Sequence, residues 1–334
     1  MTSLRVVSYG LGPIGLAAAQ LALGRKTIQL VGALDVDPAK VGKDLGELLA
    51  LGKPTGVKVE KDWKALCARL KPDVILHCTS SFLPNITDQL VEVLKSGVNI
   101  VSSAEELLVP DLQHPALAKQ IHDAALAGDA TCVGTGVNPG FAMDYAAVVA
   151  SAVTVSVDRV KCTRVVDAGT RRLPLQKKVG AGLSAQEFEK ELATGRFGHI
   201  GIRESVAMLS KALGLRVETT GISHTVAAVI ATEQRKTKFL TVEKGQVAGI
   251  RNIGYGKRDG QTVIELDLSM YVGAPNPRDE IQLFGSPDLK LVFEGGIPGD
   301  QATAAILVNT LHGCVAASAG LKTVLELQPA RLAL

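Results

Sequence analysis

The sequence predicts an α/β first domain built on a doubly wound parallel sheet, followed by an α+β second domain with a mixed open sheet. Between residues 4 and 136, apolar stretches of strand length alternate with stretches of helical spacing, which is typical of parallel βαβ units. After residue 140, strand-like stretches follow one another with turns and few helices between them. From residue 299, a long helical stretch is too apolar to stand alone, so we expect it to pack back on the first domain.

The elements of the first domain follow from apolar runs and from the residues that interrupt them. Gly97 and Gly128 stand where helix C-caps are expected. The expected strands cover residues 4–9, 29–37, 72–80, 99–103 and 130–136, and the expected helices cover residues 16–24, 62–70, 86–97 and 117–128.

The second domain begins where the pattern changes, near residue 140. Within it, KGQ has the character of a hairpin turn between two strand-like stretches. The expected strands cover residues 158–169, 216–231, 237–250, 261–274 and 289–296. The chain is therefore divided into a first domain of residues 1–140, a second of residues 141–298 and a C-terminal helical segment of residues 299–334.

Composition narrows the classes of partner. The net charge is only +3, and no basic stripe with interleaved aromatic residues is present, so we do not expect nucleic acid as a partner. No apolar run reaches the ~20 residues that span a bilayer. The opening MTSLRVV lacks the basic and apolar regions of a signal peptide. We therefore expect a cytoplasmic protein with no membrane partner.

The cysteines indicate neither a disulfide framework nor a metal site. Their number is odd, they lie far apart, and no CxxC or Cys/His ligand spacing occurs. We expect them to be small buried side chains and expect no bound metal. The five are Cys67, Cys78, Cys132, Cys162 and Cys314.

A glycine-rich loop joins the first expected strand to the first expected helix. Gly10, Gly12 and Gly15 form the pattern GxGxxG, with Pro13 and Ile14 between the last two. In this context one glycine makes a tight turn, one lets a pyrophosphate approach the backbone, and one allows close packing of helix on strand. The loop therefore predicts a Rossmann domain that binds a dinucleotide on a helix N-terminus.

The second expected strand contains Asp35 near its end, where an acid that binds the ribose is expected. Asp35 favours a free 2′-hydroxyl and hence NAD. Lys40 and Lys43 lie just beyond it and could instead bind a 2′-phosphate, or could simply be solvated. The sequence leaves the choice between NAD and NADP open.

Hydroxyl residues follow the next two strands, at the sheet edge where ligands bind in doubly wound folds. Thr79, Ser80 and Ser81 can bind cofactor phosphate or ribose, although Ser80 or Ser81 could equally cap a helix. Ser102 and Ser103 are assigned to the cofactor as well.

Two adjacent acids, Glu105 and Glu106, follow the strand whose end is expected near the nicotinamide. A carboxylate there can act as a general base or hold a cationic substrate, although a solvated acid in the first turn of a helix fits as well. Only one of two adjacent residues is expected to point toward the ligand. Asn138 precedes a proline and is therefore biased to an extended conformation that could aim its amide at a ligand, although a plain turn is an alternative.

Several motifs together resemble one family. The chain resembles the dihydrodipicolinate reductase-like superfamily and, within it, the 2,4-diaminopentanoate dehydrogenases and related native amine dehydrogenases. The resemblance covers nearly the whole chain, and its most specific part is the combination of GTGVNPGF, RRLPLQKKVGAG and GHIGIRES. It is carried further by YGLGPIG, VGALDVDPAKVGKDLGELL, SSAEELLVP and GGIPGDQATAAILVN.

The resemblance implies NAD(P)-dependent, reversible oxidative deamination of a primary amine to a ketone and ammonia. It implies that the acid/base residue is a glutamate of the EEL loop, Glu105 or alternatively Glu106, and that Asn138 lies near the nicotinamide. It also implies a second domain that binds substrate and forms a homodimer. The residues that it assigns to the substrate pocket are Val137, Asn138, Phe141, Val165, Thr170 and His199.

The chain also departs from part of the superfamily. The histidine run with its lysine and the glycine-serine-threonine loop of true dihydrodipicolinate reductases are both missing, which argues against that activity. The basic residues Arg171, Arg172, Lys177 and Lys178 could hold the carboxylate of a diamino acid or could be solvated. The remaining alternatives are a reductase of another imine or carbonyl compound and a protein that senses the cofactor without catalysis.

Overall fold

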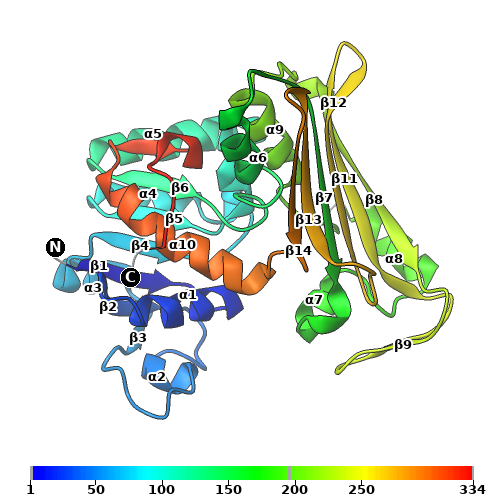
Figure 1. The fold of residues 1–334 in the computed structure, drawn as a ribbon. Coiled ribbons are helices and arrows are strands. Elements are labelled where there is room, and N and C mark those ends of the chain that lie inside the picture. The colour runs from blue at the N-terminus through cyan, green and yellow to red at the C-terminus, as the bar shows by residue number, and fades with distance from the viewer. Residues whose placement is uncertain (1–2, 195–196, 333–334) are drawn as a thin grey trace. The chain divides into compact units, whose positions relative to one another are not determined.

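The computed structural model describes residues 3–194 and 197–332 (Figure 1). The first two residues of MTSLRVV and the last two of the C-terminal segment lie outside this description. The chain forms two compact units. Unit 1 combines the chain up to Gly140 with the chain from Pro298 onward, and unit 2 contains Phe141–Ile297.

Unit 1 is built on a parallel sheet in the order β15-β6-β5-β4-β1-β2-β3, which confirms the predicted doubly wound fold. The order reverses between β1 and β4, so the carboxyl ends of these two strands form the switch point where ligands bind in such folds. The strands are β1 (Leu4–Tyr9), β2 (Ile28–Leu34), β3 (Val59–Glu60), β4 (Val74–His77), β5 (Asn99–Ser102), β6 (Thr131–Gly134) and β15 (Gly320–Lys322).

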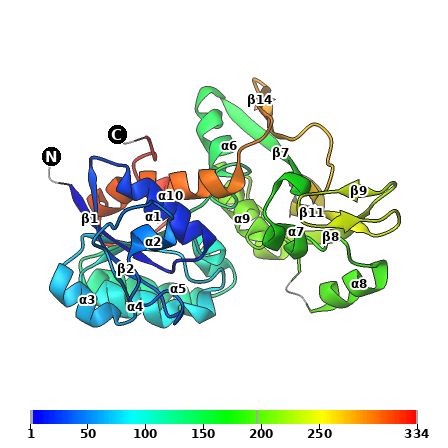
Figure 2. The same ribbon diagram turned by 90° about the horizontal axis from the view of Figure 1, so that it is seen from below.

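Helices cover both faces of this sheet (Figure 2). On one face, α10 packs against α1 and against β4, β5 and β6, as the sequence predicted for the C-terminal helix. On the other face, α3, α4 and α5 bury a core that includes Leu66, Leu90 and Ile121. The helices are α1 (Pro13–Leu23), α2 (Leu45–Leu48), α3 (Trp63–Leu70), α4 (Thr87–Lys95), α5 (Pro115–Ala127) and α10 (Gly299–Ala316), with 3₁₀ turns η1 (Leu83–Asn85), η2 (Glu105–Leu108), η3 (Pro110–Leu112) and η7 (Val324–Glu326).

Unit 2 is built on a mixed sheet in the order β14-β13-β7-β12-β11-β8, as predicted. Only the β7–β12 pair is parallel among the described strands of this sheet. Its strands are β7 (Ser156–Asp167), β8 (Ile222–Ile230), β11 (Val247–Arg258), β12 (Gln261–Tyr271), β13 (Arg278–Ser286) and β14 (Leu289–Glu294), and β9 (Arg235–Lys236) pairs with β10 (Thr241–Val242) in a separate ribbon.

One face of this sheet is covered by helices, with α9 packed on β8, β11 and β12. Strand β7 shows the alternation that results, because Val160, Cys162 and Arg164 are buried while the intervening Lys161 and Thr163 are partly exposed. The described helices of unit 2 are α6 (Tyr145–Ala150), α7 (Leu173–Lys178), α8 (Ala185–Ala193) and α9 (Ile202–Ala212), with 3₁₀ turns η4 (Ser151–Val153), η5 (Ala168–Thr170) and η6 (Thr219–Gly221).

The structure corrects several details of the predicted elements. KGQ (residues 244–246) does not form a hairpin turn, because β10 before it pairs with β9 while β11 after it pairs with β8 and β12. Unit 2 contains more helix than the sequence indicated, and β13 was not anticipated. The C-terminal helix ends at Ala316 rather than near residue 321, because residues 320–322 instead form β15, which pairs with β6.

A buried ion pair ties together three parts of unit 2. Arg164 Nη1 lies 2.6 Å from Asp279 Oδ1, and both side chains are almost completely buried. Arg164 Nη2 also donates to the carbonyl of Ile297, whose amide donates to Asp279 Oδ2. The pair therefore joins β7 to β13 and fixes the last residue of unit 2.

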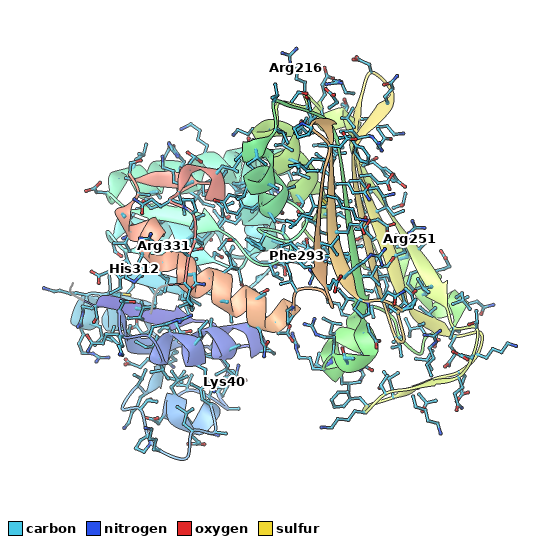
Figure 3. The ribbon with its side chains drawn as sticks, viewed as in Figure 1. Lys40, Arg216, Arg251, Phe293, His312 and Arg331 are labelled. Atoms are coloured by element: carbon cyan, nitrogen blue, oxygen red, sulfur yellow. The ribbon has the colours of Figure 1, made fainter. Side chains whose placement is uncertain are left out.

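We expect Arg164→Met to lower the free energy of unfolding by ~3–5 kcal/mol, because it leaves the Asp279 carboxylate buried without its cation. The control is Arg251→Met, which removes an ion pair between Arg251 and Asp267 in which the arginine side chain is 52% exposed (Figure 3). That change is expected to cost ~1 kcal/mol or less. Urea unfolding followed by circular dichroism measures both, and equal losses would contradict the prediction.

Candidate active site

The glycine loop follows β1 and packs tightly on the segment that follows β4. A side chain at Gly10, whose φ is +89°, would collide with the carbonyl oxygen of Cys78. A side chain at Gly15 would collide with the carbonyl oxygen of Gly10. A Cβ at Gly12, in contrast, would meet no atom within 4 Å. Packing therefore requires the outer two glycines, while the middle one leaves open space beside the backbone.

Helix α1 begins directly at this open space. Its N-cap residue, Gly12, provides no side-chain cap, Pro13 occupies the first turn, and that turn contains no acidic residue. Pro13 is exposed, Ile14 is half-buried, and Gly15 is buried under the loop. An uncapped helix N-terminus with nearby open space attracts a phosphate group. These residues fit the pyrophosphate of a dinucleotide.

Asp35 follows β2 and is fixed by three hydrogen bonds. Its Oδ2 accepts from the amide of Leu11 at 2.8 Å and from Lys40 Nζ at 3.0 Å, and its Oδ1 accepts from the amide of Asp37 at 2.9 Å. Burial raises the pKa of Asp35, but the Asp37 and Leu11 amides and the Lys40 ammonium outweigh it, so the pKa lies below its usual value. The carboxylate is thus charged and held beside the glycine loop.

Lys40, which is labelled in Figure 3, pairs with two carboxylates. Its Nζ lies 3.0 Å from Asp35 and 3.5 Å from Asp37. Lys43 instead pairs with the exposed Glu47 of α2, at 3.2 Å. Of the two lysines considered from the sequence, Lys40 contacts Asp35 and Lys43 pairs with Glu47.

The loop after β4 contains the three hydroxyl residues assigned to the cofactor. Thr79 is exposed, and its Oγ1 lies 2.9 Å from Nε2 of His77. Ser80 Oγ accepts from the amide of Phe82 and from Asn85 Nδ2, so it stabilises the turn. Neither Ser80 nor Ser81 is a helix N-cap, since the following 3₁₀ turn begins after Phe82.

Ser102 and Ser103 end the neighbouring strand but differ in exposure. The Ser102 hydroxyl is fully buried and lies 2.9 Å from His77 Nδ1, so it supports the site from within the protein. Ser103 is half-buried and hydrogen-bonds with Cys78. Burial raises the pKa of the Cys78 thiol to about 12, with the Ser103 bond opposing this shift and the charge of Glu105 adding to it. Glu105 therefore lies within electrostatic reach of Cys78, the residue on which the glycine loop packs.

Glu105 and Glu106 open the 3₁₀ turn η2 and face different surroundings. Glu106 is buried, and its Oε2 accepts from the amide of Leu83 at 2.7 Å and lies 3.2 Å from His114 Nε2. Its amide donates to the carbonyl of Ser81. Glu105 is half-buried and is the more exposed of the two. The Glu106 carboxylate thus joins two loops of the protein.

The end of β6 supports the same turn and leads to Asn138. A side chain at Gly134 would come within 2.6 Å of the carbonyl carbon of Leu107, so β6 packs directly on η2. Between residues 131 and 140, Asn138 alone is not buried, and Val137 is 6% exposed. Asn138 is therefore the side chain of this segment that can reach a ligand.

The other residues assigned to the substrate belong to unit 2. Phe141 is half-buried with its ring 6.5 Å from that of Tyr145, and Thr170 is exposed with its hydroxyl donating to the carbonyl of Asp167. Val165 lies on the opposite face of the sheet from Arg164. His199 is half-buried, and its amide donates to the side chain of Asn252. Their assignment to a substrate pocket stays a prediction.

The basic stretch divides into two pairs. Arg171 and Arg172 are half-buried before α7, whereas Lys177 and Lys178 are exposed at its end. Gln176, between them, is fully buried and was missed in the sequence. Its Nε2 donates to the carbonyl of Arg171 at 2.8 Å, and its Oε1 accepts from Thr237 at 3.0 Å. Gln176 thus fixes the backbone around the two arginines.

His77 was also missed, although one signal was present. It is the last residue of VILH, a four-residue strand that is otherwise apolar. The structure makes its ring a contact between the loops that contain Thr79 and Ser102. A polar residue that ends a buried strand at the switch point is a reasonable marker of such a contact.

Within residues 3–194 and 197–332, no group of three or more His, Cys, Asp or Glu side chains could hold a metal ion. The same part of the chain contains no helix long and apolar enough to cross a membrane.

Comparison with known proteins identifies both units. Residues 141–334 match the 2,4-diaminopentanoate dehydrogenase C-terminal domain, and residues 4–105 match the N-terminus of dihydrodipicolinate reductase. The chain is 28% identical to 2,4-diaminopentanoate dehydrogenase of Acetoanaerobium sticklandii, over 98% of this chain and 94% of that protein. It is 25% identical to an amine dehydrogenase of Streptomyces virginiae, over 64% of this chain and 61% of that one.

Solved structures agree with these matches. The amine dehydrogenase from Mycobacterium smegmatis superposes with a TM-score of 0.86 at 27% identity, covering 99% of this chain and 98% of that one. A biliverdin reductase from Synechocystis, solved with biliverdin and NADP⁺, shares only the fold, with a TM-score of 0.52 at 13% identity over 87% of this chain and 79% of that one. Because the C-terminal domain match alone covers more than half of the sequence, the chain belongs to the 2,4-diaminopentanoate dehydrogenase family and is a dehydrogenase on an NAD(P)-binding fold.

Proposed function

We propose that the protein is an NAD-dependent amine dehydrogenase that interconverts a primary amine with a ketone and ammonia. The observation that carries this proposal is that two adjacent acids have different surroundings. The Glu106 carboxylate is bound within the protein, while the more exposed Glu105 lies within electrostatic reach of Cys78, which packs on the glycine loop. A carboxylate beside a dinucleotide site suits a reaction in which nitrogen becomes cationic.

In the amination direction the overall change is ketone plus ammonia plus NADH plus a proton to amine plus NAD⁺ plus water. Glu105 attracts ammonium and accepts its proton, which frees the nitrogen lone pair to attack the carbonyl carbon. The same carboxyl group returns a proton to the hydroxyl of the carbinolamine, which leaves as water. The carboxylate then stabilises the cationic iminium. The bound nicotinamide supplies the hydride that completes the reduction.

Other residues of unit 1 hold the cofactor in this proposal. The open space at Gly12 and the uncapped start of α1 receive the pyrophosphate, and Asp35 receives the ribose hydroxyls. Thr79, Ser80, Ser81 and Ser103 contribute hydrogen bonds from the loops after β4 and β5. The buried Ser102 acts through its neighbours, and the partly exposed Asn138 side chain contacts the nicotinamide or the substrate.

The substrate itself has two candidate classes. One is a simple amine and ketone, as the name of the Mycobacterium smegmatis structure suggests. The other is 2,4-diaminopentanoate, whose carboxylate Arg171 or Arg172 would bind, and the relative that spans 98% of this chain supports it. Unit 2 is proposed to provide the substrate contacts through Phe141, Val165, Thr170 and His199, and its open sheet face is proposed to form a homodimer.

The first test is NADH and NADPH oxidation at alkaline pH with a panel of small ketones, with and without ammonium. We expect oxidation only when ammonium is present, because the reducible species is the iminium. Oxidation without ammonium would make the protein a carbonyl reductase instead. The reverse assay with small amines and with 2,4-diaminopentanoate decides between the two substrate classes.

Glu105→Gln is expected to lower kcat by ~10²–10⁴-fold, the usual contribution of a general acid/base, while leaving NADH affinity and thermal stability nearly unchanged. Glu106→Gln is the matched control, with the same chemical change one residue away. It is expected to lower the free energy of unfolding by ~1–3 kcal/mol, because it weakens the bonds to Leu83 and His114. If Glu106→Gln abolished turnover in a stable protein and Glu105→Gln did not, the roles would be reversed.

The cofactor preference follows from the charges around Lys40. Two carboxylates share that one ammonium, so the group retains a net negative charge that opposes a 2′-phosphate. We expect fluorescence titration to give a Kd for NADH at least ~10-fold lower than that for NADPH. Asp37→Asn should narrow this ratio, whereas Glu47→Gln, an equal charge change at the Lys43 pair, should not. Tighter binding of NADPH by the wild type would contradict the assignment.

A further inference from the structure

We infer that His77 is a positioning residue that sets the separation between the cofactor-binding loop at Thr79 and the strand end that leads to Glu105. The inference rests on the proposed function, in which Thr79 contacts the cofactor and Glu105 is the acid/base residue. His77 is only 1% exposed, so its side chain acts on a ligand through its neighbours and does not contact one.

The ring contacts four elements of unit 1. Its Nδ1 lies 2.9 Å from Ser102 Oγ at the end of β5. Its Nε2 lies 2.9 Å from Thr79 Oγ1 and 3.2 Å from Gln89 Oε1 on α4. The ring of Tyr9, at the end of β1, lies edge-on at 5.6 Å. Both nitrogens therefore have polar partners, and those partners belong to different segments.

The direction of these hydrogen bonds is set by their neighbours. Thr79 Oγ1 donates its proton to Gln89 Oε1. The same amide oxygen lies beside His77 Nε2 and can only accept, so Nε2 carries the ring proton. The amide of Ala104 donates to Ser102 Oγ, which leaves the Ser102 proton for Nδ1. Burial lowers the pKa of His77 to about 4, with the Gln89 bond opposing this shift, so the ring is neutral with one donor and one acceptor nitrogen.

The main chain of His77 reinforces the same link. Its carbonyl accepts from the amide of Ser103, and the next residue, Cys78, donates its amide to the carbonyl of Tyr9. The carbonyl of Cys78 then packs against Gly10 of the glycine loop. The Ser102 hydroxyl accepts from the amide of Ala104, and the next residue, Glu105, begins the 3₁₀ turn η2. His77 is thus the residue through which the cofactor cradle and the start of the glutamate turn are joined.

The two nitrogens can be replaced separately. In His77→Gln the side-chain amide nitrogen can take the place of Nε2 and keep the hydrogen bonds to Thr79 and Gln89. In His77→Asn the side-chain oxygen can take the place of Nδ1 and keep the hydrogen bond to Ser102. His77→Phe fills the same space and provides neither. The matched control is His122→Gln, which alters a histidine of α5 whose Nδ1 accepts from the amide of Leu321.

We expect a split between NADH affinity, measured by fluorescence titration, and kcat for amination at saturating cofactor. His77→Gln should keep the NADH Kd within about threefold of wild type and lower kcat ~10²-fold, the effect of misplacing a catalytic group. His77→Asn should raise the NADH Kd ~10-fold with a smaller change in kcat, and His77→Phe should show both losses. His122→Gln should change neither quantity.

The inference is overturned if folded His77→Phe has the NADH Kd and the kcat for amination of the wild type. It is also overturned if all three variants lose affinity and kcat only in proportion to their loss of thermal stability, because that would make His77 merely structural. A wild-type protein that binds NADH but aminates no ketone would refute the proposed function. The NADH affinities of the variants would still test whether the hydrogen bond from His77 to Thr79 supports dinucleotide binding.

Discussion

The reversal of strand order between β1 and β4 is the constraint on which the dinucleotide site depends. From β1 the chain continues to β2 and β3 on one side, and from β4 it continues to β5 and β6 on the other. The carboxyl ends of β1 and β4 are thereby left for ligands. The backbone there is packed so closely that Gly10 and Gly15 have no room for a side chain. The shape of the glycine loop is therefore set by the main chain, and the Asp35 carboxylate is held beside it by the amide of Leu11.

Buried polar side chains hold the loops beside these strand ends in place. Glu106 and His77 are themselves buried, and each is hydrogen-bonded to groups from two different segments of the chain. A buried polar group is costly unless its bonds are made, so the loops are held in the one arrangement that satisfies both residues. In the role that we infer for His77, these bonds keep the exposed Thr79 and the half-buried Glu105 at a fixed separation.

The sequence predicted those parts of the molecule that follow from local patterns. Strands β1 to β6, apart from the two-residue β3, correspond to expected apolar runs, because a fully buried parallel strand must be apolar throughout. Strand β13 was missed because the charged Asp279 occupies a buried position of the strand and so interrupts the expected alternation of apolar and polar residues. Strand β15 has only three residues and depends on pairing with β6. Which of Glu105 and Glu106 is bound within the protein depends on contacts with Leu83 and His114, which belong to other segments, so the EEL motif alone could not show it.

The order in which the chain is synthesised has a consequence for how unit 1 reaches its final form. Unit 2 is an insertion, since the chain leaves unit 1 at Gly140 and re-enters it at Pro298. Until α10 and β15 emerge from the ribosome, one face of the sheet beside α1 lacks its cover, and β6 remains an open edge. The dinucleotide-binding half, although encoded first, is thus completed last. A nascent chain must keep this apolar face from aggregating while the whole of unit 2 is being made.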